Sequence, residues 1–138
     1  MPDEEKKPVV DKPLETPCEN GRFIVAHAYS RCVQGHWHVL EDDDYECPDG
    51  VTRKYRVLDV DTGFPCTAKR PKPTSLFKPG LDTDCQSPRK IGEAIILECI
   101  NGFWNEVTYD VYECVGQTLR RLLPSSKPPV PTTDSCEE

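Results

Sequence analysis

The spacing of the cysteines constrains this chain more than any other feature. Eight cysteines form two sets of four, spaced C-x13-C-x14-C-x18-C and C-x13-C-x14-C-x21-C. The first three cysteines of the second set follow those of the first at an offset of 67 residues, and the fourth lies three residues out of register. A repeat at a fixed period indicates duplicated structural units. The sequence therefore predicts two copies of one small unit, the second with a longer final loop.

Other residues repeat at the same offset. The stretch CVQGHWHVLEDDDYEC, residues 32 to 47, aligns without a gap with CINGFWNEVTYDVYEC, residues 99 to 114. Both stretches keep a Gly, a Trp, a Tyr and a Glu at the same positions. The histidines and the acidic run occur in the first stretch only. Outside these stretches the matches are Arg22 with Arg89, Ile24 with Ile91 and Arg53 with Arg120.

Composition and cysteine spacing together favour disulfides over metal ligands. Each copy spans about 50 residues of a polar chain whose mean hydropathy is -0.61, a size at which a hydrophobic core alone is marginal. Zinc sites use closely paired ligands such as C-x2-C, which this chain lacks. Disulfides persist in oxidising compartments, so we expect a secreted, extracellular protein.

Charge and hydropathy exclude two classes of partner. The formal net charge is -7 and the pI is about 5.0, whereas phosphate recognition needs lysine and arginine in excess on one face. Nucleic-acid binding is therefore not expected. The chain has no apolar run of about eighteen residues, so we expect no membrane insertion.

Local patterns predict strands and hairpins. RFIVAHAYSRC at 22–32 and IGEAIILECI at 91–100 are rich in strand-forming residues. Each is followed by a turn dipeptide, a return strand at 36–40 or 103–107, and a third short strand, DYEC or VYEC. Alternating apolar and polar residues predict a further strand at 53–60, and the equivalent strand of the second copy, at 118–123, is shorter. The turns fall at Gln34-Gly35 and Asn101-Gly102.

The remaining segments frame these two copies. Residues 1–17 mix charge and proline and are predicted to be a disordered arm, and residues 67–84 are predicted to be a basic, semi-extended linker. No amphipathic helix is predicted. The predicted fold is all-β, with two tandem disulfide-stapled modules at 18–66 and 85–136.

Both copies resemble the second half of complement control protein (sushi) modules. In that family a cysteine is followed by a strand, a second cysteine about fourteen residues on, a Gly-x-Trp and a closing cysteine. Here Gly35-His36-Trp37 and Gly102-Phe103-Trp104 occupy those places. The extra cysteine at the end of each copy, and the lack of one before Cys18, depart from the family and indicate an atypical or permuted module.

The resemblance implies a disulfide pairing and a function. The family joins the first cysteine to the third and the second to the fourth, although four cysteines by themselves allow three connectivities. Atypical modules of this kind occur in helminth secreted immunomodulators that bind host cytokines or their receptors. Fibronectin type I-like modules of nematode extracellular proteins are the second similar family. The implied pairs are Cys18 with Cys47, Cys32 with Cys66, Cys85 with Cys114, and Cys99 with Cys136.

The aromatic and histidine positions have different interpretations. Trp37 and Trp104 occur in both copies beside a turn and a cysteine, so we expect core residues packed on the disulfides, with a surface hot spot as the alternative. His36 and His38 project from one face of a strand and could share a metal. The second copy has Phe103 and Asn105 there, which favours an ordinary exposed pair and no metal or cofactor.

The acidic run EDDDYE at 41–46 is particular to the first copy. It lacks the glycine bend of a calcium loop, so the choice is between a solvated loop and an acidic contact surface formed by Asp42, Asp43 and Asp44. The run could also attract the basic linker and thereby fix the angle between the modules.

No set of residues indicates catalysis, so we do not expect an enzyme. The expected function is capture or blocking of an extracellular protein ligand or receptor, such as an immune or complement component. The alternatives are a disulfide-rich protease inhibitor, with Lys69 and Arg70 in its exposed loop, and a structural extracellular-matrix module. The oligomeric state does not follow from the sequence.

Overall fold

A computed structural model describes residues 9–14, 18–75, 77–81, 85–115 and 120–136. This part of the chain consists of strands, turns and irregular segments, so it contains no helix that could cross a membrane. The all-β prediction is confirmed. The strands are β1 (Val9–Leu14), β2 (Arg22–Val33), β3 (His36–Glu46), β4 (Thr52–Pro65), β5 (Lys78–Pro79), β6 (Arg89–Ile100), β7 (Phe103–Glu113), β8 (Arg120–Pro124) and β9 (Val130–Ser135).

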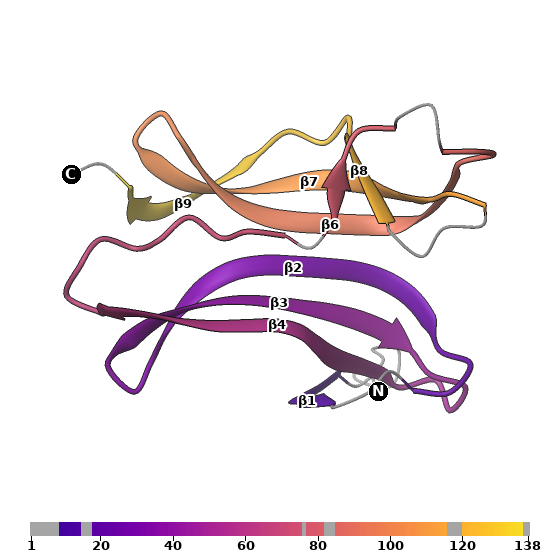
Figure 1. Cartoon of the computed structure of the whole chain (residues 1–138), viewed down its shortest axis with the longest axis horizontal. Coiled ribbons are helices and arrows are strands. Elements are labelled where there is room, and N and C mark those ends of the chain that lie inside the picture. The colour runs from indigo at the N-terminus through magenta and orange to yellow at the C-terminus, as the bar shows by residue number, and fades with distance from the viewer. Residues whose placement is uncertain (1–8, 15–17, 76, 82–84, 116–119, 137–138) are drawn as a thin grey trace, which may run out of the picture.

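The strands form one sheet in the order β1-β4-β3-β2-β6-β7-β8-β5, with β9 paired to β7. Strands β2, β3 and β4 make an antiparallel meander (Figure 1). In the second half β6 pairs antiparallel with β7, and β7 pairs antiparallel with both β8 and β9. The two halves of the repeat meet where β2 and β6 pair in parallel.

The two predicted hairpin turns are confirmed. Gln34 and Gly35 have φ values of 51° and 87°, and Asn101 and Gly102 have 52° and 85°. Two successive positive φ values are typical of the type I′ turns that join twisted antiparallel strands. The prediction of separate third strands at DYEC and VYEC is wrong, because β3 and β7 each run without a break to the glutamate before the cysteine.

The repeat is visible in the hydrogen bonds at the end of each half. The Thr62 hydroxyl donates to the Trp37 carbonyl, and the Thr132 hydroxyl donates to the Trp104 carbonyl, both at 2.8 Å. In the first half one long strand, β4, supplies this contact. In the second half the proline-rich stretch after Pro124 divides the corresponding chain into β8 and β9, where the sequence predicts a longer final loop.

Four disulfides staple the sheet, and none of the eight cysteines is left as a thiol. They are the pairs that the family resemblance implies. Each half has one bridge at the open end of its first hairpin and one beside the turn. The bridges are Cys18–Cys47, Cys32–Cys66, Cys85–Cys114 and Cys99–Cys136.

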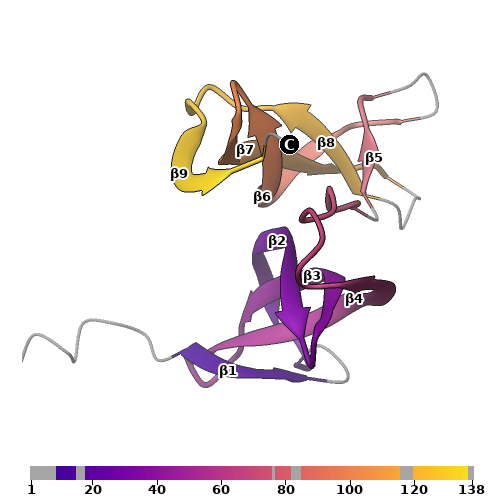
Figure 2. The same ribbon diagram turned by 90° about the vertical axis from the view of Figure 1, so that its left-hand side faces the viewer.

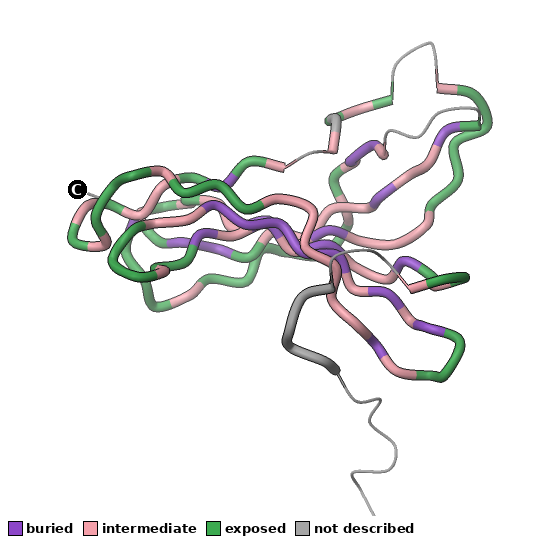
Figure 3. Tube along the Cα trace, turned by 60° about the horizontal axis from the view of Figure 1, so that its bottom comes forward, coloured by how far each residue is buried: buried purple, intermediate pink, exposed green. Residues whose placement is uncertain are grey.

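The halves share one hydrophobic core. Figure 2 shows them one above the other, and Figure 3 shows that the buried segments lie along the central strands while the hairpin tips are exposed. Gly92 allows the close approach, because a Cβ there would lie 2.5 Å from the Ile24 carbonyl oxygen. The boundaries 18–66 and 85–136 of two modules therefore stay a prediction. The core residues are Phe23, Ala26, Ala28, Tyr45, Ala94, Ile96, Val111 and Leu122.

The N-terminal segment differs from its prediction. Residues 1–17 were expected to be a disordered arm, and this is wrong for Val9–Leu14, which forms β1 and pairs in parallel with the outer edge of β4. Two valines begin this strand, and the edge of β4 offers unpaired backbone groups to it. Residues 1–8 and 15–17 of the predicted arm lie outside the described residues.

Candidate protein-binding groove

The acidic run is buried within β3. Glu41, Asp42 and Asp43 are 1–2% exposed, because β3 lies between β2 and β4 in the sheet. The predictions of a solvated loop and of an acidic contact surface are therefore both wrong. Aspartate is rare in strands, and this rarity is why the sequence suggested a loop. The signal for a strand lay in β4, where Lys54 and Arg56 stand opposite Asp44 and Asp42.

Asp42 lies at the centre of a hydrogen-bonded cluster within the first half. Arg56 donates two hydrogen bonds to its carboxylate, at 2.8 and 3.2 Å, and the Tyr29 hydroxyl donates a third at 2.6 Å. Burial alone would raise the pKa of Asp42, but the hydrogen bonds from Arg56 and Tyr29 outweigh it and the pKa is lowered. Burial, followed by the hydrogen bond to Asp42, raises the pKa of Tyr29 to about 12.

The replacement Asp42→Asn is expected to bring the pKa of Tyr29 down from about 12, because it removes the negative charge that opposes ionisation. Stopped-flow pH jumps that follow phenolate absorbance would measure this before alkaline unfolding. The pKa of Tyr109, also raised to about 12 by burial and its hydrogen bond to Glu98, is the internal control and should not change.

The raised pKa values of Tyr29 and Tyr109 make the stability of the fold depend on pH. Both tyrosines ionise later in the folded protein than in the unfolded chain, so their contribution to stability is lost as the pH rises from 10 to about 12. If the pKa of Tyr29 were the same in the Asp42→Asn protein as in the native protein, Asp42 would not be the partner that raises it.

Asp43 connects the two halves. Its carboxylate accepts a hydrogen bond of 2.9 Å from Arg120, whose other end donates to the Tyr45 hydroxyl at 2.9 Å. The guanidinium also lies 4.4 Å above the centre of the Phe23 ring. Burial raises the pKa of Asp43, and the charge of Arg120 offsets part of this effect. We call this group of side chains the Arg120 clasp.

The hypothesis that the acidic run attracts the basic linker and fixes the angle between the modules stays a prediction. Ser75 of the linker donates to the Glu41 carboxylate at 3.2 Å. No lysine or arginine of residues 67–75 forms an ion pair with the run. Among the described residues its arginine and lysine partners are Arg22 of β2, Lys54 and Arg56 of β4, and Arg120 of β8. Among these cations, Arg120 is the one that comes from the second half.

The two histidines face aspartates of β4. The His38 Nδ1 atom lies 2.7 Å from the Asp59 carboxylate, and the His36 Nδ1 atom lies 3.4 Å from that of Asp61. Within the described residues, no group of three or more side chains is arranged to hold a metal ion.

Residues 67–75, which we call the strap, lie against both halves. The Trp37 indole donates to the Ala68 carbonyl at 2.9 Å. Arg70 lies 4.9 Å above the Trp37 ring, donates to the Ser30 carbonyl at 2.8 Å and is 3.7 Å from the Asp134 carboxylate of β9. Arg70, predicted as a binding residue, therefore anchors the strap, whereas its neighbour Lys69 is exposed.

The strap forms one wall of a groove of about 370 Å³, which we call the Trp104 groove. This volume lies near the lower end of the range of about 300–1,000 Å³ that is usual for ligand pockets. Trp104 itself is 4% exposed, as expected for a core residue. The groove is lined by Phe64, Lys69, Arg70, Pro71, Lys72, Cys99, Trp104 and Cys136.

The rim of the groove has two features that favour binding. Phe64 is 59% exposed at the end of β4, although it is a large apolar residue. Lys69 and Lys72 are exposed, and neither forms an ion pair with any residue that the structure describes. In the first half Arg70 lies over the ring of the equivalent residue, Trp37. The groove could not be predicted from the sequence, since it needs the strap to lie against the second half.

Comparisons with known proteins found no similar protein. No protein-family model matches the chain, and neither a curated protein nor a solved structure matches it. The resemblance to complement control modules therefore rests on the repeated cysteine and Gly-x-Trp positions alone.

Proposed function

We propose that this chain is a non-enzymatic, extracellular binding protein that captures a segment of another protein in the Trp104 groove. The observation that carries the proposal is the groove itself, where an apolar floor meets an exposed phenylalanine and two exposed lysines. Exposed apolar surface rimmed by charge is typical of protein interaction sites.

The chemistry of the groove selects the kind of segment. Phe64, Pro71 and Cys99 offer an apolar surface above the buried Trp104, which suits a bulky apolar or aromatic side chain. Lys69 and Lys72 suit carboxylates on either side of that anchor. The partner segment is therefore an extended, acidic stretch with one large apolar residue.

The proposed context is secretion and a role in immunity. Four disulfides support an oxidising compartment. The likeness of each repeat to an atypical complement control module supports two tandem modules and a cytokine, receptor or complement component as the partner. Capture would be steric and electrostatic, without a cofactor.

The protease-inhibitor alternative has one specific observation in its favour. Lys69 is exposed between the disulfide at Cys66 and the anchored Arg70, and inhibitors present a rigid exposed loop of this kind. Stoichiometric inhibition of a lysine-specific serine protease, abolished by Lys69→Ala, would favour it over the groove.

The groove is tested with a capped pentapeptide that has a central phenylalanine flanked by two carboxylates on each side. Titration of the oxidised protein, followed by two-dimensional NMR, is expected to show saturable binding. The charge reversal Lys69→Glu together with Lys72→Glu should weaken it at least about tenfold, or about 1.4 kcal/mol, through lost attraction and added repulsion.

Two controls sharpen this test. Lys127→Glu changes the charge of an exposed side chain whose ion pair with Glu93 is outside the groove, and it should leave binding unchanged. A peptide with alanine in place of the phenylalanine should bind weakly. Equal binding by all variants, or shifted resonances away from Trp104 and Phe64, would overturn the assignment of the groove.

A further inference from the structure

A second cavity, of about 430 Å³, lies at the opposite end of the strands from the Trp104 groove. It is formed where β2 and β6 begin and where β3 and β7 end, and the two cavities share no lining residue. Its lining residues are Gly21, Arg22, Phe23, Tyr45, Arg89, Lys90, Ile91, Glu113 and Arg120.

The repeat explains why cations gather in this cavity. Arg22 and Arg89 are equivalent residues, and each pairs with the equivalent glutamate of its own half, at 2.8 Å for Glu46 and 3.4 Å for Glu113. Parallel pairing of β2 with β6 places both arginines at the same end of the sheet. Duplication has therefore brought two copies of one surface arginine to the walls of a single cavity.

Arg120 lines the cavity because the second half lacks the carboxylate that pairs with the equivalent arginine in the first half. Its equivalent in the first half, Arg53, pairs with Asp49 at 2.7 Å. At the position of Asp49 the second copy has Gly116, which offers no carboxylate. Arg120 instead reaches across to Asp43 and carries positive charge into the space between the halves.

The lining contains four cations and one carboxylate, Glu113. Each cation has a carboxylate partner, and three of these partners lie outside the lining: Glu46 for Arg22, Asp110 for Lys90 and Asp43 for Arg120. Arg89 is 76% exposed and makes a single long hydrogen bond, so most of its N–H donors face solvent. The free donors of Arg89 can therefore hydrogen-bond the oxygens of an anionic ligand.

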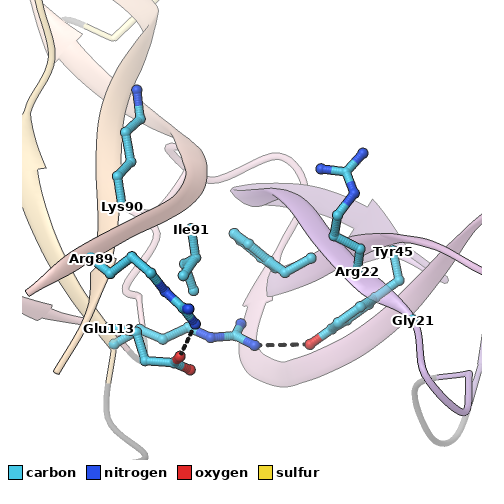
Figure 4. Close-up of a pocket in the computed structure, with 9 residues that line it drawn as sticks. Gly21, Arg22, Tyr45, Arg89, Lys90, Ile91 and Glu113 are labelled. Atoms are coloured by element: carbon cyan, nitrogen blue, oxygen red, sulfur yellow. Dashed lines mark hydrogen bonds and ion pairs between the residues drawn. The ribbon is translucent and has the colours of Figure 1, made fainter. Parts of the chain in front are cut away.

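The arrangement also provides an apolar surface. Figure 4 shows Arg89 directed toward Glu113 and the Tyr45 hydroxyl directed into the same region, with Ile91 nearby. Arg22 and Lys90 come from opposite sides of this view, and their charged ends point away from the region between Arg89, Glu113 and Tyr45. The Phe23 ring packs edge-on against Tyr45 at 5.9 Å between centroids, so aromatic edges and an aliphatic side chain stand beside the guanidinium groups.

We propose that this cavity binds an aryl ester of phosphate or sulfate. The oxyanion would take the solvent-facing N–H donors of Arg89, since the planar guanidinium matches such oxygens in a bidentate manner. The aromatic ring would lie against Ile91 and Tyr45. Both esters share this chemistry.

The test is calorimetric titration of the intact, oxidised protein with phenyl phosphate and, separately, phenyl sulfate. We expect one saturable site for at least one ester and at least tenfold weaker binding of inorganic phosphate and of phenol. The replacement Arg89→Gln should weaken the aryl ester at least tenfold. It removes a largely exposed ion pair, so thermal unfolding should show that the protein stays folded.

Lys127→Gln is the matched control, because it removes a lysine–glutamate ion pair at a site outside the cavity; its affinity should equal that of the native protein. Stronger binding of one ester identifies phosphate or sulfate as the natural group. Equal binding of inorganic phosphate and the aryl esters, or an unchanged affinity in Arg89→Gln, would overturn the proposal. Neither result depends on the peptide titration of the Trp104 groove.

Discussion

Replacing Arg120 by methionine is expected to lower the free energy of unfolding by about 3–5 kcal/mol, the usual effect of breaking a buried ion pair. Arg120 is 21% exposed and its partner Asp43 only 2%, so the replacement leaves a carboxylate buried without its cation. It also removes the donor to Tyr45 and the guanidinium above Phe23. Urea unfolding followed by circular dichroism would measure the change.

The repeat supplies a matched control for this prediction. Arg53→Met alters the equivalent arginine, whose partner Asp49 is 52% exposed and stays hydrated without the cation, so the expected loss is much smaller than for Arg120→Met. Similar losses in the two variants would show that the Arg120 clasp adds nothing beyond a surface pair.

The pH dependence gives a second readout of the clasp. Burial raises the pKa of Asp43 in the native protein, and loss of Arg120 should raise it further. A carboxyl group with a raised pKa in the folded state stabilises the fold at low pH and loses that contribution as the pH rises. The loss of unfolding free energy caused by Arg120→Met should therefore become smaller as the pH falls. At neutral pH, combining Arg120→Met with Asp43→Asn should also make this loss smaller.

Removing the Cys99–Cys136 disulfide by replacing both cysteines with alanine is expected to cost about 4 kcal/mol, from the loop-closure entropy of the residues it encloses. The bridge holds the end of β9 beside the turn, where the Cys136 N–H donates to the Gly102 carbonyl at 2.9 Å. Both cysteines line the Trp104 groove. Peptide binding in the groove should consequently be lost together with the stability.

The Cys32–Cys66 bridge is the equivalent in the first half and encloses a loop of similar length, with sequence separations of 34 and 37. Its double alanine variant should lose about as much stability. Because neither cysteine lines the Trp104 groove, peptide binding at low temperature should be retained. Equal loss of binding in both variants would show that global loosening, and not the wall of the groove, is responsible.

The features that sequence reasoning predicted correctly are local. Alternating apolar residues indicate β2 and β6 because side chains in a strand point alternately to opposite faces. The dipeptides Gln34-Gly35 and Asn101-Gly102 tolerate the positive φ values that a tight hairpin needs. The family resemblance added the disulfide pairing, which the spacing by itself left open.

The acidic run shows where sequence reasoning failed. Strand propensity reflects packing and the neighbours across the sheet more than the backbone of the residue itself. Asp42 and Asp44 are stable in β3 because Arg56 and Lys54 of β4 stand opposite them. A pattern confined to residues 41–46 cannot reveal those cations, and so the run resembled a solvated loop.

The sequence by itself determined two copies of a disulfide-stapled β meander, since cysteine spacing, alternation and turn residues act over short distances. Only the tertiary structure decided how the copies meet: β2 pairs with β6 at Gly92, Arg120 crosses to Asp43, and the strap lies against Trp104. These contacts join residues far apart in the chain, and no local periodicity encodes them. Both candidate binding sites lie at places where the halves come together, which is why neither could be predicted from one copy alone.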